Sequence, residues 1–345
     1  MATEKKSDGS TPSSLPDDYC SRICQEQQQP VMEQMLLAAL SSAQKDRILE
    51  DVGYTAAQLK ADVSQIKEWL HQQPHLPPSR LKEKDQFFEL YLTGCKGSLE
   101  TAKRKIDNYY TFRATSELFD VRDPMVPGYL SGLKQYEFAV LPQTNPDGQR
   151  LFLGTFVDTD PENFDFLNMC KVLVNRSEVY LRLGHYCTQN YLLFNCKGAS
   201  PALTLKLRPS LLRDLIFLME EVLPIRICKI GFINTPTYVE LAVNNLIKPF
   251  LSTKLQQRFY VTSGGYEDVL NYFSPDMLPS DYGGLSTNPT LKDYSKIWND
   301  YDLQHRDWYL NDLSEQNDES KRPNIDLPKN SYFGVHGSLK KLVID

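Results

Sequence analysis

Hydrophobic residues in the first third of the chain recur three or four residues apart, the spacing of an amphipathic helix. The clearest of these helices begins after Thr55, which with Gln58 has the form of a capping box, and ends before Pro74. Its apolar positions are Leu59, Val63, Ile66 and Leu70. A second helix is predicted from about residue 85 to 92, and a third begins after Ser98. Residues 45–120 are therefore expected to form an all-helical domain, preceded in residues 1–44 by a polar tail that leads into a helix.

The pattern changes near residue 150, where short apolar runs alternate with longer helical stretches. The runs that predict strands are residues 151–157, 190–196, 227–233 and 258–262. Between them, the segment 210–224 carries apolar residues on one broad face, as expected for a helix packed on a sheet. This alternation predicts an α/β domain with a mostly parallel sheet in residues 121–285. Residues 286–345 are expected to be an acidic segment followed by a polar tail.

One helical segment near the last strand has two interpretations. Tyr238, Ala242, Leu246 and Phe250 are spaced four residues apart and give a long apolar stripe, and Pro249 is expected to kink the helix close to its end. The plainer interpretation is a helix packed on its own sheet. The sharper one is a mobile cover over an apolar cavity, with a basic rim that meets anionic lipid head groups.

Charge limits the partners that the chain can bind. Its 345 residues include 38 Lys and Arg against 44 Asp and Glu, a net charge of −6, which argues against a general nucleic-acid binder. Within residues 203–260, however, eight basic residues stand against four acidic ones. Because the sequence shows neither a secretory signal nor a long apolar run, we expect a cytoplasmic protein without a membrane span. The seven cysteines include no C-x-x-C pair and are expected to be buried, reduced thiols.

No catalytic or metal-binding constellation stands out. The dinucleotide, P-loop, zincin and nucleophile-elbow motifs are absent. His71 and His75 flank Pro74, which prevents one helix from aligning them as metal ligands, so a solvated turn is the better interpretation. His185 and Cys187 are better explained as interior residues than as a base and a nucleophile. We therefore expect no catalysis, no metal and no cofactor.

Several strings resemble the CRAL-TRIO (Sec14-like) lipid-binding family. Residues 230–259 read IGFINTPTYVELAVNNLIKPFLSTKLQQRF and residues 273–284 read FSPDMLPSDYGG, similar to that family's strand, gate helix and L-P-x-x-Y-G-G ending. Residues 84–119 resemble its N-terminal helical domain, and residues 306–323 look like the insect branch of α-tocopherol-transfer-protein-like members. The resemblance implies an α/β fold in which a helical bundle precedes a mostly parallel sheet, with a gate helix over a hydrophobic pocket.

The resemblance also implies a function. Members carry tocopherol, retinaldehyde, phosphatidylinositol or related lipids without catalysing a reaction, and the tocopherol-carrier branch recognises phosphatidylinositol phosphates in a basic cleft. By motif alignment, the basic positions of that cleft fall on Arg226, Lys254 and Arg258. In contrast, Glu89 and Thr93 stand where arginines are usual, and Cys228 stands at a position that is basic in that carrier. Each lost basic residue near an anionic membrane removes about 1 kcal/mol, which weakens the expected phosphoinositide affinity.

The candidate cavity residues are aromatic and aliphatic side chains of the predicted strands and gate helix, and each has an ordinary core interpretation as well. They are Phe152, Phe156, Tyr191, Leu193, Phe232, Tyr238, Leu246 and Phe250. The first hypothesis is a cytoplasmic carrier that transfers a tocopherol, retinoid, carotenoid or phospholipid between membranes, touching their surfaces transiently. The alternative is a phosphoinositide-binding membrane adaptor with a vestigial cavity, and an enzyme is the weakest option.

Overall fold

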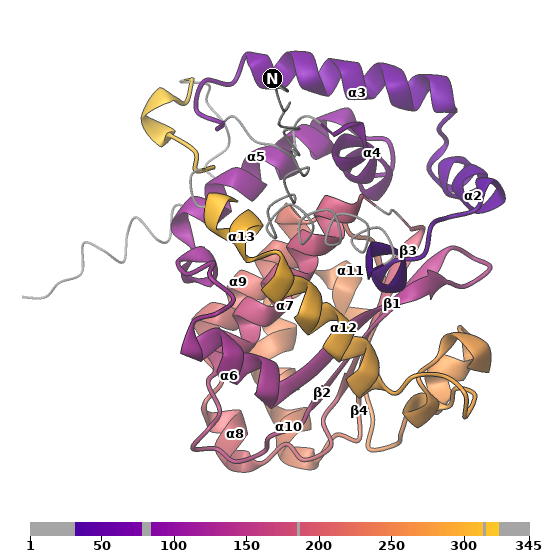
Figure 1. Cartoon of the computed structure of the whole chain (residues 1–345), viewed down its shortest axis with the longest axis vertical. Coiled ribbons are helices and arrows are strands. Elements are labelled where there is room, and N and C mark those ends of the chain that lie inside the picture. The colour runs from indigo at the N-terminus through magenta and orange to yellow at the C-terminus, as the bar shows by residue number, and fades with distance from the viewer. Residues whose placement is uncertain (1–31, 78–83, 185–186, 313–314, 324–345) are drawn as a thin grey trace, which may run out of the picture.

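The N-terminal part of the protein is helical, as the apolar spacing predicts. The computed structural model describes residues 32–77, 84–184, 187–312 and 315–323 (Figure 1). The first helices are α2 (Ser42–Val52), α3 (Ala56–His71), α4 (Asp85–Gly94), α5 (Leu99–Thr115) and α6 (Pro127–Gln135). The capping box of Thr55 and Gln58 begins α3, and the Ser98 hydroxyl caps α5, so both predicted starts are confirmed. Residues 1–31, most of the predicted tail, lie outside the described residues.

A five-stranded sheet follows, and its strands lie side by side in chain order. They are β1 (Tyr136–Thr144), β2 (Gln149–Phe156), β3 (Gln189–Asn195), β4 (Ile227–Ile233) and β5 (Phe259–Val261). The β1–β2 pair is antiparallel, and the other three pairs are parallel. The predicted mostly parallel sheet is therefore confirmed.

The strand β1 is absent from the prediction. Most of its side chains are buried, so it lacks the polar and apolar alternation that marks a half-buried strand. The turn that joins it to β2 has the sequence Asn-Pro-Asp-Gly, residues 145–148, and Gly148 adopts a φ of 74°. Such a turn between two apolar runs is the signal that could have found the hairpin.

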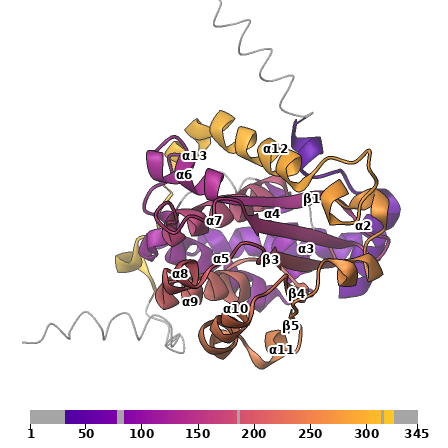
Figure 2. The same cartoon turned by 90° about the horizontal axis from the view of Figure 1, so that it is seen from below.

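Helices cover one face of the sheet, and a helix also covers its β1 edge. The cover of the face consists of α7 (Phe166–Leu183), α8 (Pro201–Leu205), α9 (Pro209–Phe217), α10 (Thr237–Ala242) and α11 (Thr253–Gln256). The helix α12 (Leu291–Gln304) lies beside β1, while α10 and α11 lie near β4 and β5 (Figure 2). The Trp298 indole donates to the Val140 carbonyl at 3.1 Å, and the Phe138 amide donates to the Ser295 hydroxyl at 3.2 Å. These contacts satisfy backbone groups at the free edge of the sheet.

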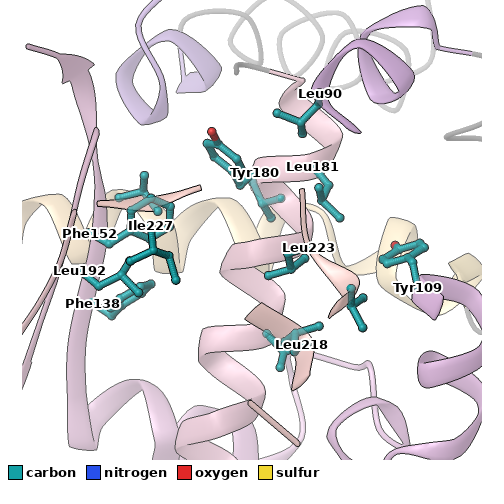
Figure 3. Close-up of a cluster of buried hydrophobic side chains, with 14 of the residues drawn as sticks. Leu90, Tyr109, Phe138, Phe152, Tyr180, Leu181, Leu192, Leu218, Leu223 and Ile227 are labelled. Carbon is teal, nitrogen blue, oxygen red and sulfur yellow. The ribbon is translucent and has the colours of Figure 1, made fainter. Parts of the chain in front are cut away.

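The helical part and the α/β part share one hydrophobic core. Side chains from the helical part, such as Leu90 and Tyr109, belong to the same buried cluster as Tyr180 of α7 and Phe152 and Leu192 of the sheet (Figure 3). Buried ion pairs also connect the two parts, because the Glu178 carboxylate on α7 contacts the guanidinium groups of Arg113 and Arg122. The proposed domain limits at residues 45–120 and 121–285 thus divide a continuous interior.

The predicted acidic C-terminal segment is largely helical and packed. It forms α12 and α13 (Arg306–Asp312). The Asp302 carboxylate is fully buried, where it pairs with Arg176 and accepts hydrogen bonds from the hydroxyls of Tyr129 (2.7 Å) and Tyr309 (2.8 Å). The count of charges alone does not reveal this packing, because a buried carboxylate with an arginine partner carries no sequence signal of its own.

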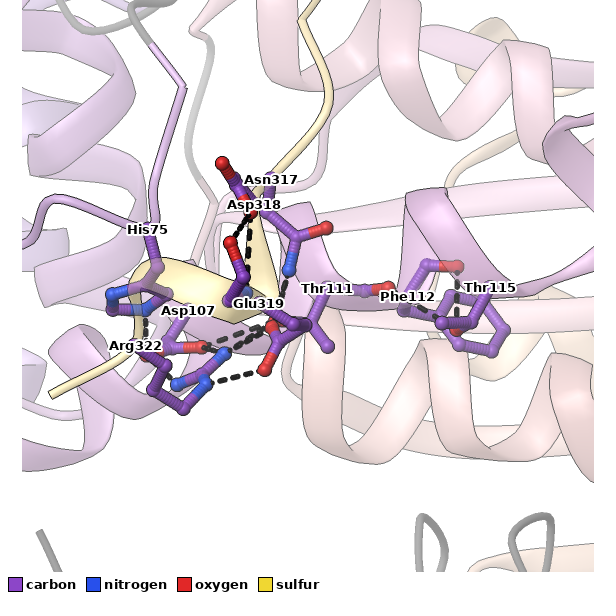
Figure 4. Close-up of polar contacts among 10 residues, drawn as sticks. His75, Asp107, Thr111, Phe112, Thr115, Asn317, Asp318, Glu319 and Arg322 are labelled. Atoms are coloured by element: carbon purple, nitrogen blue, oxygen red, sulfur yellow. Dashed lines mark hydrogen bonds and ion pairs between the residues drawn. The ribbon is translucent and has the colours of Figure 1, made fainter. Parts of the chain in front are cut away.

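Residues 315–323 return to the helical part, where Arg322 contacts Asp107 through two hydrogen bonds of 2.8 Å each (Figure 4). The second oxygen of Asp107 also lies 3.0 Å from the His75 imidazole. His75 is buried, so the expected solvated turn is wrong for His75, whereas His71 is exposed as expected. The physical reason is a long-range contact: the returning segment covers the turn, and the Asp318 amide donates to the His75 carbonyl at 2.8 Å.

Candidate ligand-binding site

An apolar cavity of about 170 Å³ lies between the sheet and its helical cover. The floor is formed by side chains of the strands, including Phe156, Leu192, Phe194, Ile230, Phe232 and Phe259. The walls are formed by side chains of α7 and α9, including Met169, Leu173, Leu212, Leu215 and Ile216. Among the residues that the structure describes, no charged one lines this cavity.

The floor is built by strand alternation and parallel register. Leu192 and Phe194 of β3 point to the same face, and their neighbours in register on β4 are Ile230 and Phe232. The Phe232 ring lies 5.1 Å from that of Phe194 and 5.0 Å from that of Phe259. The floor is therefore a continuous aromatic and aliphatic surface, suited to a hydrocarbon ligand.

The gate segment, residues 237–250, closes one side of the cavity. It consists of α10, the π-turn η4 (Val243–Ile247) and the 3₁₀ turn η5 (Lys248–Phe250), which contains Pro249. The helical geometry thus changes before the proline, because a proline removes an amide donor and clashes with the preceding turn. The gate side chains that line the cavity are Val239, Ala242, Val243 and Ile247.

Of the predicted gate stripe, Ala242 lines the cavity, whereas Tyr238, Leu246 and Phe250 each lie next to a residue of the lining stripe. Tyr238 and Leu246 are half-buried beside the cavity, and Phe250 is 41% exposed. The tyrosine instead donates a hydrogen bond to the Ala199 carbonyl. Two parallel apolar stripes run along this segment, the second being Val239, Val243, Ile247 and Leu251. Spacing alone cannot choose between them, because both fit a helical repeat.

The predicted strand residues divide between the two faces of the sheet. Phe156 and Phe232 line the cavity. Phe152 lies on the same face but packs between Phe138 and Tyr180, with ring centroids at 6.3 and 5.9 Å. The remaining two candidates lie on the opposite face, because they alternate with the lining residues of β3. These are Tyr191 and Leu193.

Tyr191 belongs to a polar cluster behind the sheet. Its hydroxyl lies 2.6 Å from that of Tyr260 and donates to the Asp268 carboxylate at 2.7 Å. The Lys229 ammonium also contacts Asp268 at 2.6 Å. Burial alone would raise the pKa of Asp268, but the hydrogen bonds from Lys229 and Tyr191 outweigh it and lower that pKa. Lys229, between Cys228 and Ile230, could have shown which face of the sheet points away from the cavity, because a lysine side chain is not expected to line an apolar cavity.

The three predicted basic residues come together in a second cavity of about 310 Å³, called here the basic cleft. Met219, in the π-turn η3 (Leu218–Val222), lines both cavities. The cationic side chains that line the cleft are Lys96, Lys105, Arg226, Lys254 and Arg258. Two carboxylates, those of Glu220 and Glu221, lie there as well. Sequence reasoning missed Lys96 and Lys105, which come from the helical part of the chain.

Only some of these cations are neutralised within the protein. Arg226 pairs with Asp51 at 2.5 Å, and the Lys105 ammonium donates to the Leu223 carbonyl at 2.7 Å. Among the described residues, neither Lys96 nor Lys254 has an ion-pair partner. Burial lowers the pKa of Lys254, and the nearby charges of Arg258, Lys96 and Arg226 lower it further. The cleft therefore concentrates positive charge that an anion would relieve.

Lys96 follows the last turn of α4 in a left-handed conformation, with a φ of 55°. Its amide donates to the Thr93 carbonyl at 3.2 Å, and the Gly97 amide donates to the Leu92 carbonyl at 2.9 Å, which are the two hydrogen bonds of a Schellman motif. The end of α4 thus places the lysine in the lining of the basic cleft.

The departures from the family pattern lie away from the basic cleft lining. Glu89 and Thr93 are on α4, where the Thr93 hydroxyl donates to the Glu89 carbonyl at 2.8 Å. Burial raises the pKa of Glu89. Burial likewise raises the pKa of Cys228 to about 11, and its thiol donates to the Asn190 carbonyl.

Within the described residues, no His, Cys, Asp or Glu group is placed to hold a metal ion, and no helix is long and apolar enough to cross a membrane.

An N-terminal helical region, a mostly parallel sheet and an apolar cavity beneath a gate define a lipid-binding fold of the Sec14 type. Comparison with known families agrees: residues 134–284 match the CRAL/TRIO domain, and residues 55–129 match the family described as Pinta-like, UBA domain. The chain belongs to the CRAL-TRIO (Sec14-like) family of lipid-binding proteins. The insect tocopherol branch remains a prediction.

The chain is similar to two curated relatives and to one solved structure. Clavesin-1 of Xenopus laevis is 25% identical over 233 residues, which cover 66% of this chain and 68% of that protein. Clavesin-2 of Homo sapiens is 22% identical over 257 residues, which cover 72% and 76%. The crystal structure of Sfh5 covers 74% of this chain and 99% of its own, with a TM-score of 0.45 and 11% identity.

Proposed function

We propose that the protein binds one small hydrophobic ligand in the apolar cavity and transfers it between membranes without catalysing a reaction. The observation that carries this proposal is a cavity of about 170 Å³ whose described lining residues are all uncharged, with the gate segment at one side. Removing roughly 200 Å² of apolar ligand surface from water supplies about 5 kcal/mol at ~25 cal/mol per Å². Tocopherols, retinoids, carotenoids and phospholipids are the ligand classes to test.

The size of the cavity bears on how a ligand enters. An engineered cavity of about 150 Å³ in another protein holds benzene. In the arrangement described, the cavity of about 170 Å³ therefore accommodates a ring or a short stretch of chain, and a longer lipid requires outward movement of the gate segment. Leu241 and Phe250 on this segment are 57% and 41% exposed, which suits contact with a bilayer.

Extraction and titration test this proposal. Organic extracts of the purified protein are examined by mass spectrometry, and the stripped protein is titrated with each lipid class. Val243→Trp places a large side chain in the cavity and is expected to abolish binding, whereas Leu241→Trp, on the exposed side of the gate segment, is the matched control. An empty protein that takes up none of the four classes would contradict a carrier function.

We infer a second candidate function, recognition of anionic lipid head groups such as phosphoinositides by the basic cleft. The unpaired charges of Lys96 and Lys254, in the part of the chain that the structure describes, favour it, together with Arg226 and Arg258. Transient membrane contact from the cytoplasm follows from this hypothesis. The adaptor alternative requires head-group binding without a ligand in the apolar cavity.

Vesicle flotation distinguishes these possibilities. Phosphatidylcholine vesicles with and without phosphatidylinositol bisphosphate are compared for the wild type and for Lys254→Ala/Arg258→Ala. Loss of two cations at about 1 kcal/mol each predicts roughly thirtyfold weaker binding to the charged vesicles. The pair Lys292→Ala/Lys296→Ala on α12 removes the same charge far from the cleft and serves as control. Equal flotation of both double variants would count against the head-group site.

A further inference from the structure

The apolar cavity contains a hydroxyl that lacks a hydrogen-bond partner. Its lining includes three polar side-chain groups, those of Tyr136, Cys196 and Thr204. The Thr204 hydroxyl donates to the Ser200 carbonyl at 3.0 Å, and the Cys196 thiol, a weak donor, lies 4.0 Å from the Phe194 carbonyl. Across the described residues, no hydrogen bond involves the Tyr136 hydroxyl. This hydroxyl is therefore the polar group in the lining that is available to a ligand.

The tyrosine ring occupies a place that a glycine keeps open. A Cβ atom at Gly154 would lie 2.4 Å from the Tyr136 hydroxyl oxygen and 2.8 Å from two ring carbons, so any other residue would require the ring to shift. Glycine inside a strand weakens the strand and often marks a close approach. Because Gly154 pairs with Phe138 on one side and Phe194 on the other, the ring extends from β1 across the floor of the cavity.

The packing also holds the ring in one orientation. The Phe156 ring meets it edge to face, with centroids 5.3 Å apart, and Tyr136 is only 4% exposed. A hydroxyl that is fixed before a ligand arrives loses little entropy when it donates a hydrogen bond. The site is therefore preorganised for recognition rather than assembled by the ligand.

The chemistry of this group selects a neutral oxygen. Burial raises the pKa of Tyr136 well above its ordinary value, so the hydroxyl remains a donor across the physiological pH range. No cation of the described part of the chain lines the cavity, so a carboxylate or phosphate inside it would be buried without a counter-charge, which is strongly unfavourable. A hydroxyl or carbonyl oxygen accepts from tyrosine without that penalty.

We propose that Tyr136 determines the specificity of the cavity, and that the ligand is a neutral lipophile whose single hydroxyl or carbonyl oxygen accepts a hydrogen bond from its hydroxyl. This inference rests on the proposed carrier function, because it requires that the cavity binds a lipophile. The proposal predicts that an alcohol, aldehyde or ketone binds more tightly than a hydrocarbon of the same length. It also predicts that any phosphate group of a ligand lies outside the cavity.

Displacement of a fluorescent hydrocarbon tests the proposal. Diphenylhexatriene is bound to the protein and competed with 1-hexadecanol or hexadecane, in the wild type and in Tyr136→Phe. We expect the variant to lose roughly three- to tenfold in affinity for the alcohol relative to the alkane. The matched control is Tyr282→Phe, because the Tyr282 hydroxyl accepts from the Asn195 side chain at 2.8 Å and does not line the cavity. This control is expected to leave the ratio of the affinities for 1-hexadecanol and hexadecane unchanged.

A measurement on the unmodified protein makes the test independent of any variant. The carbonyl stretch of bound 2-heptadecanone is recorded by infrared spectroscopy and is expected at a lower frequency than in hexadecane solution, since a donor weakens the carbonyl bond. An unshifted band, or equal weakening of alcohol and alkane by Tyr136→Phe, would overturn the proposal while leaving the carrier function intact. Failure of the wild type to bind diphenylhexatriene and both competitors would instead overturn the carrier function.

Discussion

The buried carboxylate of Asp302 tests whether the C-terminal helix α12 belongs to the folding unit. Asp302→Ala removes a group that is 0% exposed and that contacts Arg176 and the hydroxyls of Tyr129 and Tyr309. Breaking a buried ion pair costs about 3–5 kcal/mol, and each buried group left unsatisfied costs about 1–3 kcal/mol. Because these contributions overlap, we expect a loss of about 5 kcal/mol in the free energy of unfolding. That is a large share of the ~5–15 kcal/mol that holds a typical domain folded.

Urea unfolding followed by tryptophan fluorescence measures this loss, since Trp298 is itself buried on α12. Asp300→Ala is the matched control. It removes a carboxylate from the same helix, and because that carboxylate pairs with the exposed Lys296, the expected change is below about 1 kcal/mol. Replacing both buried partners, in Arg176→Met/Asp302→Leu, should recover much of the stability, since no charge is left unpaired. Equal unfolding midpoints for Asp302→Ala and Asp300→Ala would refute the reasoning.

Three further predictions concern other parts of the molecule. Thr55→Ala removes the cap of α3 and should lower the free energy of unfolding by about 1 kcal/mol, whereas Thr55→Ser should restore it, as urea unfolding will show. Gly154→Ala displaces the Tyr136 ring and should weaken diphenylhexatriene binding, measured by fluorescence titration; unchanged binding would contradict the close contact. Arg322→Gln should destabilise the protein at neutral pH. Burial alone would raise the pKa of Asp107, but Arg322 and His75 lower it overall, so this stabilisation is present above pH ~3.8 and disappears as the pH falls through the lowered value. A difference between wild type and variant that persists at lower pH would contradict the assignment to this carboxylate.

Local signals allowed much of the helical part to be predicted. The capping box at Thr55 and the cap at Ser98 act within three residues, so the sequence alone determines where these helices begin. The parallel strands were equally accessible, because buried strands read as short apolar runs. β1 escaped notice because Glu137 and Pro142 interrupt its apolar run, and a proline argues against a strand.

The cavity lining was harder to predict because it depends on which face of each strand or helix points to the cavity. On β3 the candidates Tyr191 and Leu193 alternate with the true lining residues Leu192 and Phe194, and an apolar run carries no mark of which face is which. On the gate segment, two adjacent stripes are both apolar. The basic cleft was only partly predicted for a different reason. Lys96 lies some 130 residues from Arg226, and only the fold brings them together.

The contact between α12 and β1 has a consequence for aggregation. An uncovered edge strand is a template on which a second chain can pair. Trp298 and Ser295 occupy the outward backbone groups of Val140 and Phe138, while β5, at the other edge, is only three residues long. A chain truncated before residue 291 would present the bare edge of β1 as well as lose the buried contacts of Asp302, and it should form intermolecular sheet.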